Sequence, residues 1–308
     1  MSPQPIIFVV GPTATGKTEV AFLLAQELKG EIISCDAMQV YREISIANNK
    51  PPLAMREKIV HHLIDFVSVK EEFDVARYNQ MALKTIREII NRKRMPIIVG
   101  GSGLYMQILL DGIFQEKGKD LTLRKFLKER LLKEGSEALY AELKKVDKDA
   151  SLKIHPHDTR RMLRALEVFY LTQRPISELK KNRSGLWGKY NITILGLNCD
   201  RKLLYQRINQ RVEEMILNGL IEEIKNLKDI QLSLTSDKII GVSEIKGYLE
   251  GKYDIIKAKD LMKLKTRHFA KRQLTWLRKD KRLKWVEFKE SDSPSTIVKK
   301  IISILLKS

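Results

Sequence analysis

The fold of this chain is decided by the stretch Gly11-Pro12-Thr13-Ala14-Thr15-Gly16-Lys17-Thr18, which fits the pattern G-x-x-x-x-G-K-[ST]. The apolar run Ile6–Val10 before it predicts a buried strand, and the segment Glu19–Leu28 after it predicts a helix. In this context the glycines let backbone N–H groups converge on phosphate oxygens at a helix N-terminus. Lys17 adds a mobile positive charge, and the Thr18 hydroxyl is placed to ligate Mg²⁺. The stretch therefore predicts a binding site for a di- or triphosphate.

A strand that ends in a carboxylate is predicted next, at Glu31–Asp36. Ligands of open α/β sheets gather at the carboxyl ends of strands, so we expect Asp36 to face the same crevice as the glycine loop. Mg²⁺ ligation and general-base catalysis are both open to this side chain. A surface carboxylate without a role is the simplest alternative.

A second glycine turn, Gly100-Gly101-Ser102-Gly103, follows the apolar strand Ile97–Val99 and indicates that two turns share one crevice. That strand carries no terminal Asp, so the Walker B signature of a motor ATPase is missing. A third strand is expected within His61–Phe66, where adjacent histidines point to opposite faces and so argue against a paired metal site. Helices are expected at Val75–Asn91 and Leu104–Leu110.

The middle of the chain differs from its two ends. Residues 116–188 are charged helical segments without a strand-like run, and a strand is predicted again at Tyr190–Leu197. The helices expected in the middle are Leu121–Lys133, Ser136–Val146 and Asp158–Leu171. We predict an α/β fold, in which a P-loop-type parallel sheet core flanked by helices (1–115 and 189–308) carries an all-helical insertion (116–188).

Positive charge indicates a polyanionic partner. The 308 residues include 57 Lys plus Arg against 38 Asp plus Glu, a net charge of +19. Attraction to phosphates scales with such charge, so nucleic acid is the first expectation, and a solvated lysine-rich surface is the alternative. Arg160 and Arg164 lie one helical turn apart, a spacing that suits phosphate oxygens, although pairing with Asp158 and Glu167 within the helix is equally open.

The remaining compositional signals favour a cytoplasmic protein. Cys35 and Cys199 form neither a disulfide framework nor a C-x-x-C metal site. The first residues lack the basic region of a signal peptide, and no run approaches the ~20 apolar residues that span a bilayer.

Five further stretches, together with the glycine loop, resemble the tRNA dimethylallyltransferase (tRNA isopentenyltransferase) family nearly from end to end. They are Ser34-x-Asp36-x-x-Gln39-x-Tyr41, Val99-Gly100-Gly101-Ser102-Gly103-Leu104-Tyr105, His155-Pro156-His157-Asp158-x-Arg160-Arg161-x-x-Arg164-Ala165-Leu166-Glu167, Arg207-Ile208-x-x-Arg211-Val212 and Ala270-Lys271-Arg272-Gln273-x-Thr275-Trp276. They occur in the order that the family has, which makes coincidence negligible.

The resemblance implies transfer of a dimethylallyl group from its diphosphate to N6 of the adenine just 3′ of the tRNA anticodon. It assigns the donor diphosphate to Gly11, Pro12, Thr13, Ala14, Thr15, Gly16, Lys17 and Thr18, with Mg²⁺ as cofactor held through Thr18. It assigns catalysis to Asp36 as general base and to Lys17, Ser102 and Arg211.

The resemblance also implies a tRNA surface, on which the helical insertion grips the anticodon stem-loop. The residues carried over are Asp36, Ala37, Met38, Gln39, Ser102, Arg124, Arg160, Arg161, Met162, Leu163, Arg164, Lys238, Ile239, Ile240, Gly241, Val242 and Ser243. The expected partners are tRNA and dimethylallyl diphosphate, with no membrane partner, and we expect a monomer.

Three departures from the family pattern fall on RNA-facing loops. Ala37 replaces a usual Ser, Ala47-Asn48-Asn49-Lys50-Pro51 replaces Gly-Thr-Ala-Lys-Pro, and Gly241-Val242-Ser243-Glu244 replaces Gly-Tyr-Lys-Glu. Altered tRNA preference or a reduced rate is the hypothesis that these changes motivate. A small-molecule P-loop kinase, an adenylate isopentenyltransferase and a catalytically weak RNA-binding relative are the alternatives.

Overall fold

The computed structural model describes residues 5–114 and 120–307. The contacts divide the chain into two compact units, the core unit (Met1–Leu109 with Trp187–Ser308) and the helical unit (Leu110–Leu186). The boundary at 115 and 116 predicted from the sequence lies outside the described residues. Along the described chain, no helix is both long enough and apolar enough to cross a membrane.

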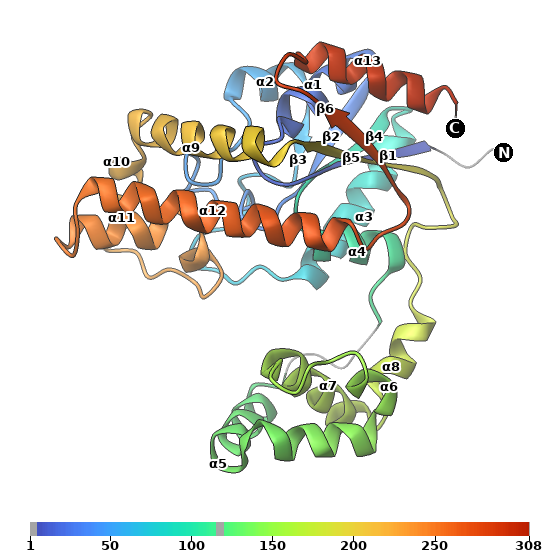
Figure 1. Cartoon of the computed structure of the whole chain (residues 1–308). Coiled ribbons are helices and arrows are strands. Elements are labelled where there is room, and N and C mark those ends of the chain that lie inside the picture. The colour runs from blue at the N-terminus through green and yellow to red at the C-terminus, as the bar shows by residue number, and fades with distance from the viewer. Residues whose placement is uncertain (1–4, 115–119, 308) are drawn as a thin grey trace. The chain divides into compact units, whose positions relative to one another are not determined.

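The core unit is built on one parallel sheet of six strands in the order β3-β2-β4-β1-β5-β6 (Figure 1). The strands are β1 (Pro5–Val10), β2 (Gly30–Cys35), β3 (His61–His62), β4 (Met95–Gly100), β5 (Asn191–Cys199) and β6 (Leu283–Phe288). Ile6 to Val10 are all buried, as expected for a parallel strand covered on both faces. The predicted α/β fold with a parallel sheet is confirmed.

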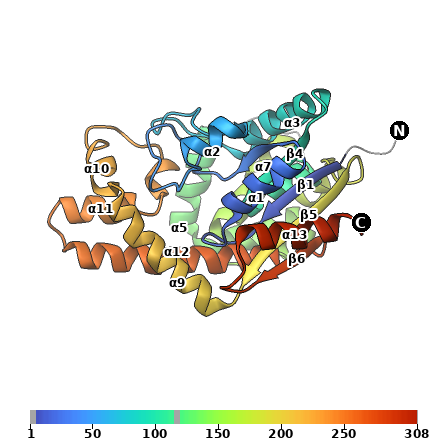
Figure 2. The same cartoon turned by 90° about the horizontal axis from the view of Figure 1, so that it is seen from above.

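Helices cover both faces of this sheet. The helices of the core unit are α1 (Lys17–Glu27), α2 (Leu53–Lys58), α3 (Val75–Asn91), α4 (Gly103–Asp111), α9 (Arg201–Leu217), α10 (Leu220–Lys225), α11 (Val242–Leu249), α12 (Ile255–Leu277) and α13 (Pro294–Leu305), with the 3-10 turn η2 (Ser236–Lys238). Figures 1 and 2 show α1 and α13 side by side over one face, and Figure 1 shows α3 on the other. Ile7 and Val9 of β1 pack in the cluster with α1 and α13, whereas Phe8 is buried on the opposite side because strand residues alternate.

The third strand is shorter than predicted. It covers only His61–His62, because Leu63 and Asp65 adopt positive φ angles of 61° and 59°, which end extended structure. Nε2 of His62 lies 2.7 Å from Oε2 of Glu31 on the neighbouring β2. This histidine therefore has a structural partner within the sheet.

Caps set the starts of two helices that differ from the sequence-based predictions of a helix at Asp260–Lys281 and a loop at Ser236–Ser243. Asp254 starts α12 by accepting the N–H of Lys257 at 2.8 Å. The start of α11 falls inside a segment predicted as a loop. There Gly241, with φ 107°, donates its N–H to Oε2 of Glu244 at 2.7 Å.

The helical unit has a separate apolar core. Its elements are α5 (Leu121–Val146), α6 (Lys148–Ser151), α7 (Thr159–Thr172), α8 (Ile176–Leu179) and the 3-10 turn η1 (Lys180–Asn182). Gly135, with φ 81° and ψ 170°, interrupts α5 at the point where the sequence predicted two helices. Leu127 and Leu139 of α5 pack with Met162 and Leu166 of α7. This apolar contact gives the unit a core of its own.

Candidate active site

The glycine loop leaves the carboxyl end of β1 and runs into α1. A Cβ at Gly11 would lie 2.7 Å from the carbonyl oxygen of Leu197, so the close approach of β5 requires glycine. Gly16, with φ 78°, occupies the N-cap of α1 and has no side chain that could cap the helix. The first N–H groups of α1 are therefore available to an anionic ligand.

Two cations lie against this loop. Nζ of Lys17 donates to the Pro12 carbonyl at 2.7 Å, and Nη1 of Arg211 donates to Oγ1 of Thr13 at 2.9 Å. Burial, and then the charge of Arg211, lower the pKa of Lys17 to about 7. Burial also lowers the pKa of Arg211. Buried cations held together in this way are typical of a site whose ligand brings negative charge.

Asp36 follows β2 and reaches the same place. Lys17, Thr18, Asp36 and Arg211 line one pocket. Oδ1 of Asp36 accepts the N–H of Met38 at 2.9 Å. Burial raises the pKa of Asp36, against the opposing effects of that N–H and of the Lys17 charge. A raised pKa makes this carboxylate a stronger proton acceptor, which favours the general-base role over the two alternatives.

Ser102 of the second glycine turn forms hydrogen bonds with the residues on either side of Asp36. Its Oγ accepts the N–H of Ala37 at 3.1 Å, and its own N–H donates to the Cys35 carbonyl at 3.2 Å. A Cβ at Gly100 would lie 2.1 Å from that same carbonyl oxygen, so this turn also depends on glycine. The Ser102 hydroxyl thus holds the residue that follows Asp36.

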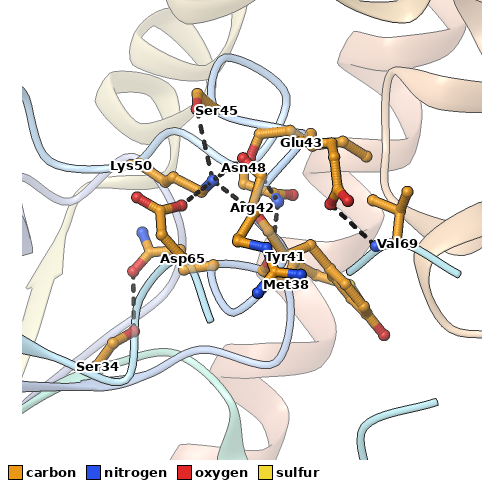
Figure 3. A network of polar contacts seen from close by, with 12 residues as sticks. Ser34, Met38, Tyr41, Arg42, Glu43, Ser45, Asn48, Lys50, Asp65 and Val69 are labelled. Carbon is orange, nitrogen blue, oxygen red and sulfur yellow. Dashed lines mark hydrogen bonds and ion pairs between the residues drawn. The ribbon is translucent and has the colours of Figure 1, made fainter. Parts of the chain in front are cut away.

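The segment after Asp36 is fixed by polar contacts (Figure 3). Nδ2 of Asn48 donates to the Met38 carbonyl at 2.6 Å. The side chain of Lys50 is buried and forms an ion pair with Asp65. Asn48 is one of the departures from the family pattern, and its contact gives it a structural role in this chain.

Gln39 and Gln273 also line the pocket. Gln39 belongs to the predicted tRNA segment, and its Oε1 accepts the Ser34 hydroxyl at 2.9 Å. Gln273 was not among the predicted site residues. Its Oε1 accepts the Thr13 N–H at 2.8 Å, and its Nε2 donates to the Gly101 carbonyl at 3.0 Å. The stretch Ala270–Trp276 was the only sequence signal for this residue, and it did not reveal these partners.

A family model described as IPP transferase matches residues 39–280. The chain belongs to the IPP transferase family. The tRNA dimethylallyltransferase of Natranaerobius thermophilus is 43% identical over 99% of this chain and 92% of its own length. That of Heliobacterium modesticaldum is 44% identical over 91% of this chain and 88% of its own length. The family resemblance inferred from the motifs is confirmed.

Solved structures of IPP transferase relatives are similar over nearly the whole chain. The full-length tRNA isopentenylpyrophosphate transferase of Bacillus halodurans has a TM-score of 0.73 and 36% identity, covering 99% of this chain and 97% of its own. A eukaryotic dimethylallyltransferase acting on tRNA has a TM-score of 0.85 and 28% identity, covering 99% and 79%. The P-loop-type core is thus shared with these proteins.

The arginines that the IPP transferase resemblance assigned to tRNA lie in the helical unit. Nε and Nη2 of Arg124 donate to Glu167 at 2.6 and 3.0 Å, and Nη1 of Arg164 donates to the same carboxylate at 2.7 Å. Arg161 pairs with Asp158 at 3.3 Å. The alternative of pairing within the helix, which was open for Arg160 and Arg164, therefore holds for Arg164, whereas Asp158 pairs with Arg161, which that alternative did not name.

Three neighbouring positions of α7 differ in exposure. Arg160 is exposed, Leu163 is half-buried, and Met162 is wholly buried in the core of the helical unit. A tRNA contact at position 162 would therefore have to come from the backbone.

The segment 238–243 of the core unit presents few side chains to solvent. Lys238 and Ser243 are exposed, and Ile240 is half-buried. Ile239 and Val242 are buried. The exposed Ser243 hydroxyl donates to Oε1 of Glu244 at 2.8 Å.

The pocket offers oxygen ligands that suit Mg²⁺. The Thr18 hydroxyl and the Asp36 carboxylate line it, and residues 5–114 and 120–307 contain no group of three His, Cys, Asp or Glu able to hold a metal ion. Mg²⁺ is often bound through one or two protein oxygens together with substrate phosphates. The donor set therefore fits an ion that arrives with a diphosphate.

Proposed function

We propose that this chain transfers a dimethylallyl group from dimethylallyl diphosphate to N6 of the adenine 3′-adjacent to the tRNA anticodon. One observation carries the proposal, namely that a carboxylate with a raised pKa lines the same pocket as a phosphate loop and two cations. The tRNA dimethylallyltransferase relatives support the choice of substrates.

On the donor side, the allylic C–O bond breaks and its electron pair leaves with the diphosphate. Lys17, Arg211 and the N–H groups at the start of α1 stabilise the negative charge that develops on the departing oxygens. Burial lowers the pKa of Lys17 to about 7, and a bound polyanion raises it, so Lys17 is charged when the donor is present. Mg²⁺ held through Thr18 would add Lewis-acid neutralisation of the diphosphate.

On the acceptor side, the exocyclic nitrogen of adenine is a poor nucleophile because its lone pair is delocalised into the ring. As the C–N6 bond forms, the nitrogen loses a proton, which passes to the carboxylate of Asp36. Ser102 holds Ala37 and so orients the backbone that carries this base. The target adenine has to leave the stacked anticodon loop to enter the pocket.

The tRNA is proposed to bind through the predicted surface. Lys238 and Ser243 in the core unit and Arg160 and Arg161 in the helical unit are the exposed members with long or polar side chains. The helical unit is proposed to grip the anticodon stem-loop. The chain is proposed to act as a monomer in the cytoplasm.

The test is to incubate the protein with Mg²⁺, dimethylallyl diphosphate and unmodified tRNA, and to seek N6-dimethylallyladenosine by mass spectrometry. Prenylation of free AMP instead of tRNA would indicate an adenylate isopentenyltransferase, and consumption of ATP would indicate a kinase. Binding of tRNA without product would indicate a weak RNA-binding relative. Several anticodon stem-loops should be compared, since uniform high activity would refute altered tRNA preference.

A further inference from the structure

One buried amide connects the two glycine turns of the pocket. Gln273 belongs to α12 and is 7% exposed. Its Oε1 accepts the Thr13 N–H at 2.8 Å, and its Nε2 donates to the Gly101 carbonyl at 3.0 Å. Because one partner is a donor and the other an acceptor, the two contacts also fix which amide atom is the oxygen.

The second turn is shaped to receive this side chain. A Cβ at Gly101 would lie 2.1 Å from Nε2 of Gln273 and 3.0 Å from the Gly11 carbonyl oxygen. A Cβ at Gly103 would lie 2.3 Å from the ring of Trp276, which is one helical turn beyond Gln273. Only glycine allows the turn to approach α12 this closely.

The hydrogen bonds that begin at Gln273 continue through the second turn to the residue beside the proposed base. The turn that Gln273 contacts also contains Ser102, whose Oγ accepts the N–H of Ala37 at 3.1 Å. Ala37 directly follows Asp36. A hydrogen-bonded path therefore runs from Thr13 in the diphosphate loop, through Gln273 and the second turn, to the backbone beside the base.

We propose that Gln273 is a positioning residue that sets the separation between the diphosphate loop and Asp36. This inference rests on the proposed function, since it assigns Gln273 a part in prenyl transfer. The electrophilic carbon, the adenine nitrogen and the base have to be aligned, and a misplacement of about 1 Å can cost about 10²-fold in rate.

The first test replaces Gln273 by Met, which keeps the volume of the side chain and removes both hydrogen bonds. With both substrates saturating, Gln273→Met should lower kcat at least about tenfold, while the tRNA dissociation constant stays within about twofold. Gln206→Met makes the same change at an exposed position of α9 and should leave both values unchanged. A kcat like that of the wild type, or a loss confined to tRNA affinity, would overturn the proposal.

The second test does not depend on activity. Without Gln273 the Thr13 amide loses its acceptor, so its hydrogen exchange in Gln273→Met should accelerate at least about fivefold. Amides of the helical unit should be unaffected, because the substitution lies in the core unit. Unchanged exchange at Thr13 would show that no such bridge exists.

The third test covers the case in which Gln273→Met fails to fold. Gln273→Glu has the same shape, and when ionised it accepts the Thr13 N–H but cannot donate to the Gly101 carbonyl. When protonated it does both, so its kcat relative to the wild type should rise as pH falls. Lys17, Asp36 and Arg211 line the same pocket, and the ratio to the wild type removes the part of their titration that the two proteins share. A ratio independent of pH would contradict the bridge.

The two proposals fail in different ways. A wild-type protein that makes no prenylated adenosine refutes the proposed function, and the exchange of the Thr13 amide still decides whether Gln273 joins the two turns. An active wild type with unchanged variants refutes only the role of Gln273.

Discussion

Asp36 is the side chain on which the proposed chemistry most depends, because it is the carboxylate that lines the phosphate pocket and has a raised pKa. Asp36→Asn keeps the shape and can still accept the Met38 N–H, but it cannot take a proton. We expect kcat to fall by about 10²- to 10⁴-fold, the range that general-base catalysis supplies. The tRNA dissociation constant, measured by filter binding, should stay within about twofold. A variant that keeps the wild-type kcat would remove Asp36 from the mechanism.

The burial of Asp36 also predicts a pH dependence. The base acts in its ionised form, and burial raises its pKa above the usual range of Asp. Lowering the pH through that raised pKa protonates the base, so kcat/KM, which reports the free enzyme, should fall on the acid side at a pH higher than about 3.9, the ordinary Asp value. Profiles of kcat/KM against pH test this expectation. The pH profile of Asp36→Asn should lack this fall on the acid side. If the fall persists in the variant, the titrating group is not Asp36.

Among the elements, α5 and α7 are joined by one buried carboxylate. Glu167 of α7 is 2% exposed and accepts hydrogen bonds from Arg124 of α5 and from Arg164. Burial opposes ionisation, but the hydrogen bonds of the two arginines hold the pKa of Glu167 below its usual value. Its contribution to stability is therefore present above the unfolded-state pKa and is lost as pH falls through the lower folded-state pKa.

Removing that charge should loosen the helical unit. We expect Glu167→Gln to lower the free energy of unfolding by about 1–3 kcal/mol, because an amide cannot accept from both guanidinium groups with the same strength. Urea denaturation of the full chain measures the change, and hydrogen exchange of α5 and α7 peptides locates it. Glu137→Gln, at an exposed position of α5, is the matched control and should have no measurable effect. Equal effects of the two substitutions would contradict the conclusion that Glu167 joins α5 to α7.

The local sequence was sufficient to predict most helices and strands, because the hydrophobic periodicity and the caps that indicate them lie within a few neighbouring residues. Val75–Asn91 was predicted with its observed bounds, and the Asp74 carboxylate accepts two N–H groups at 3.0 Å to start it. The strand after His62 was over-extended, because positive φ at Leu63 and Asp65 leaves no mark in a hydrophobic pattern. The start of α11 was missed because its cap depends on the conformation of Gly241.

The sequence singled out a site residue only where a recognisable motif contained a side chain whose chemistry suits the proposed reaction. Lys17, Asp36 and Arg211 were named from the sequence, and they line one pocket. Gln273 was not, since its partners lie 260 and 172 residues away and no neighbouring residues encode them. The same holds for Glu223, which accepts the N–H groups of residues 45, 46 and 47 at 2.6, 2.7 and 2.9 Å. Such contacts join residues that are far apart in the sequence, so they form only in the assembled fold and leave no local pattern.

For the whole molecule, the net charge of +19 is the property that most favours a polyanionic substrate. Exposed cations occur in both units, with Arg160 and Arg161 in the helical unit and Lys238, Lys271 and Arg272 in the core unit. Binding of such side chains to RNA phosphates releases condensed counterions, so affinity depends steeply on salt. The residues that line the pocket then govern the chemistry, and the charge of the surface governs the encounter with RNA.

We therefore expect the logarithm of the tRNA association constant to fall linearly with the logarithm of salt concentration. Each phosphate contact contributes about 0.7–0.9 to the slope, so Arg160→Ala should reduce it by nearly that amount if Arg160 binds a phosphate. Arg87→Ala makes the same substitution at an exposed position of α3 and should leave the slope unchanged. Titrations with an anticodon stem-loop at several potassium chloride concentrations measure both. A slope that both variants share with the wild type would place the RNA on other cations, and affinity independent of salt would contradict the electrostatic surface altogether.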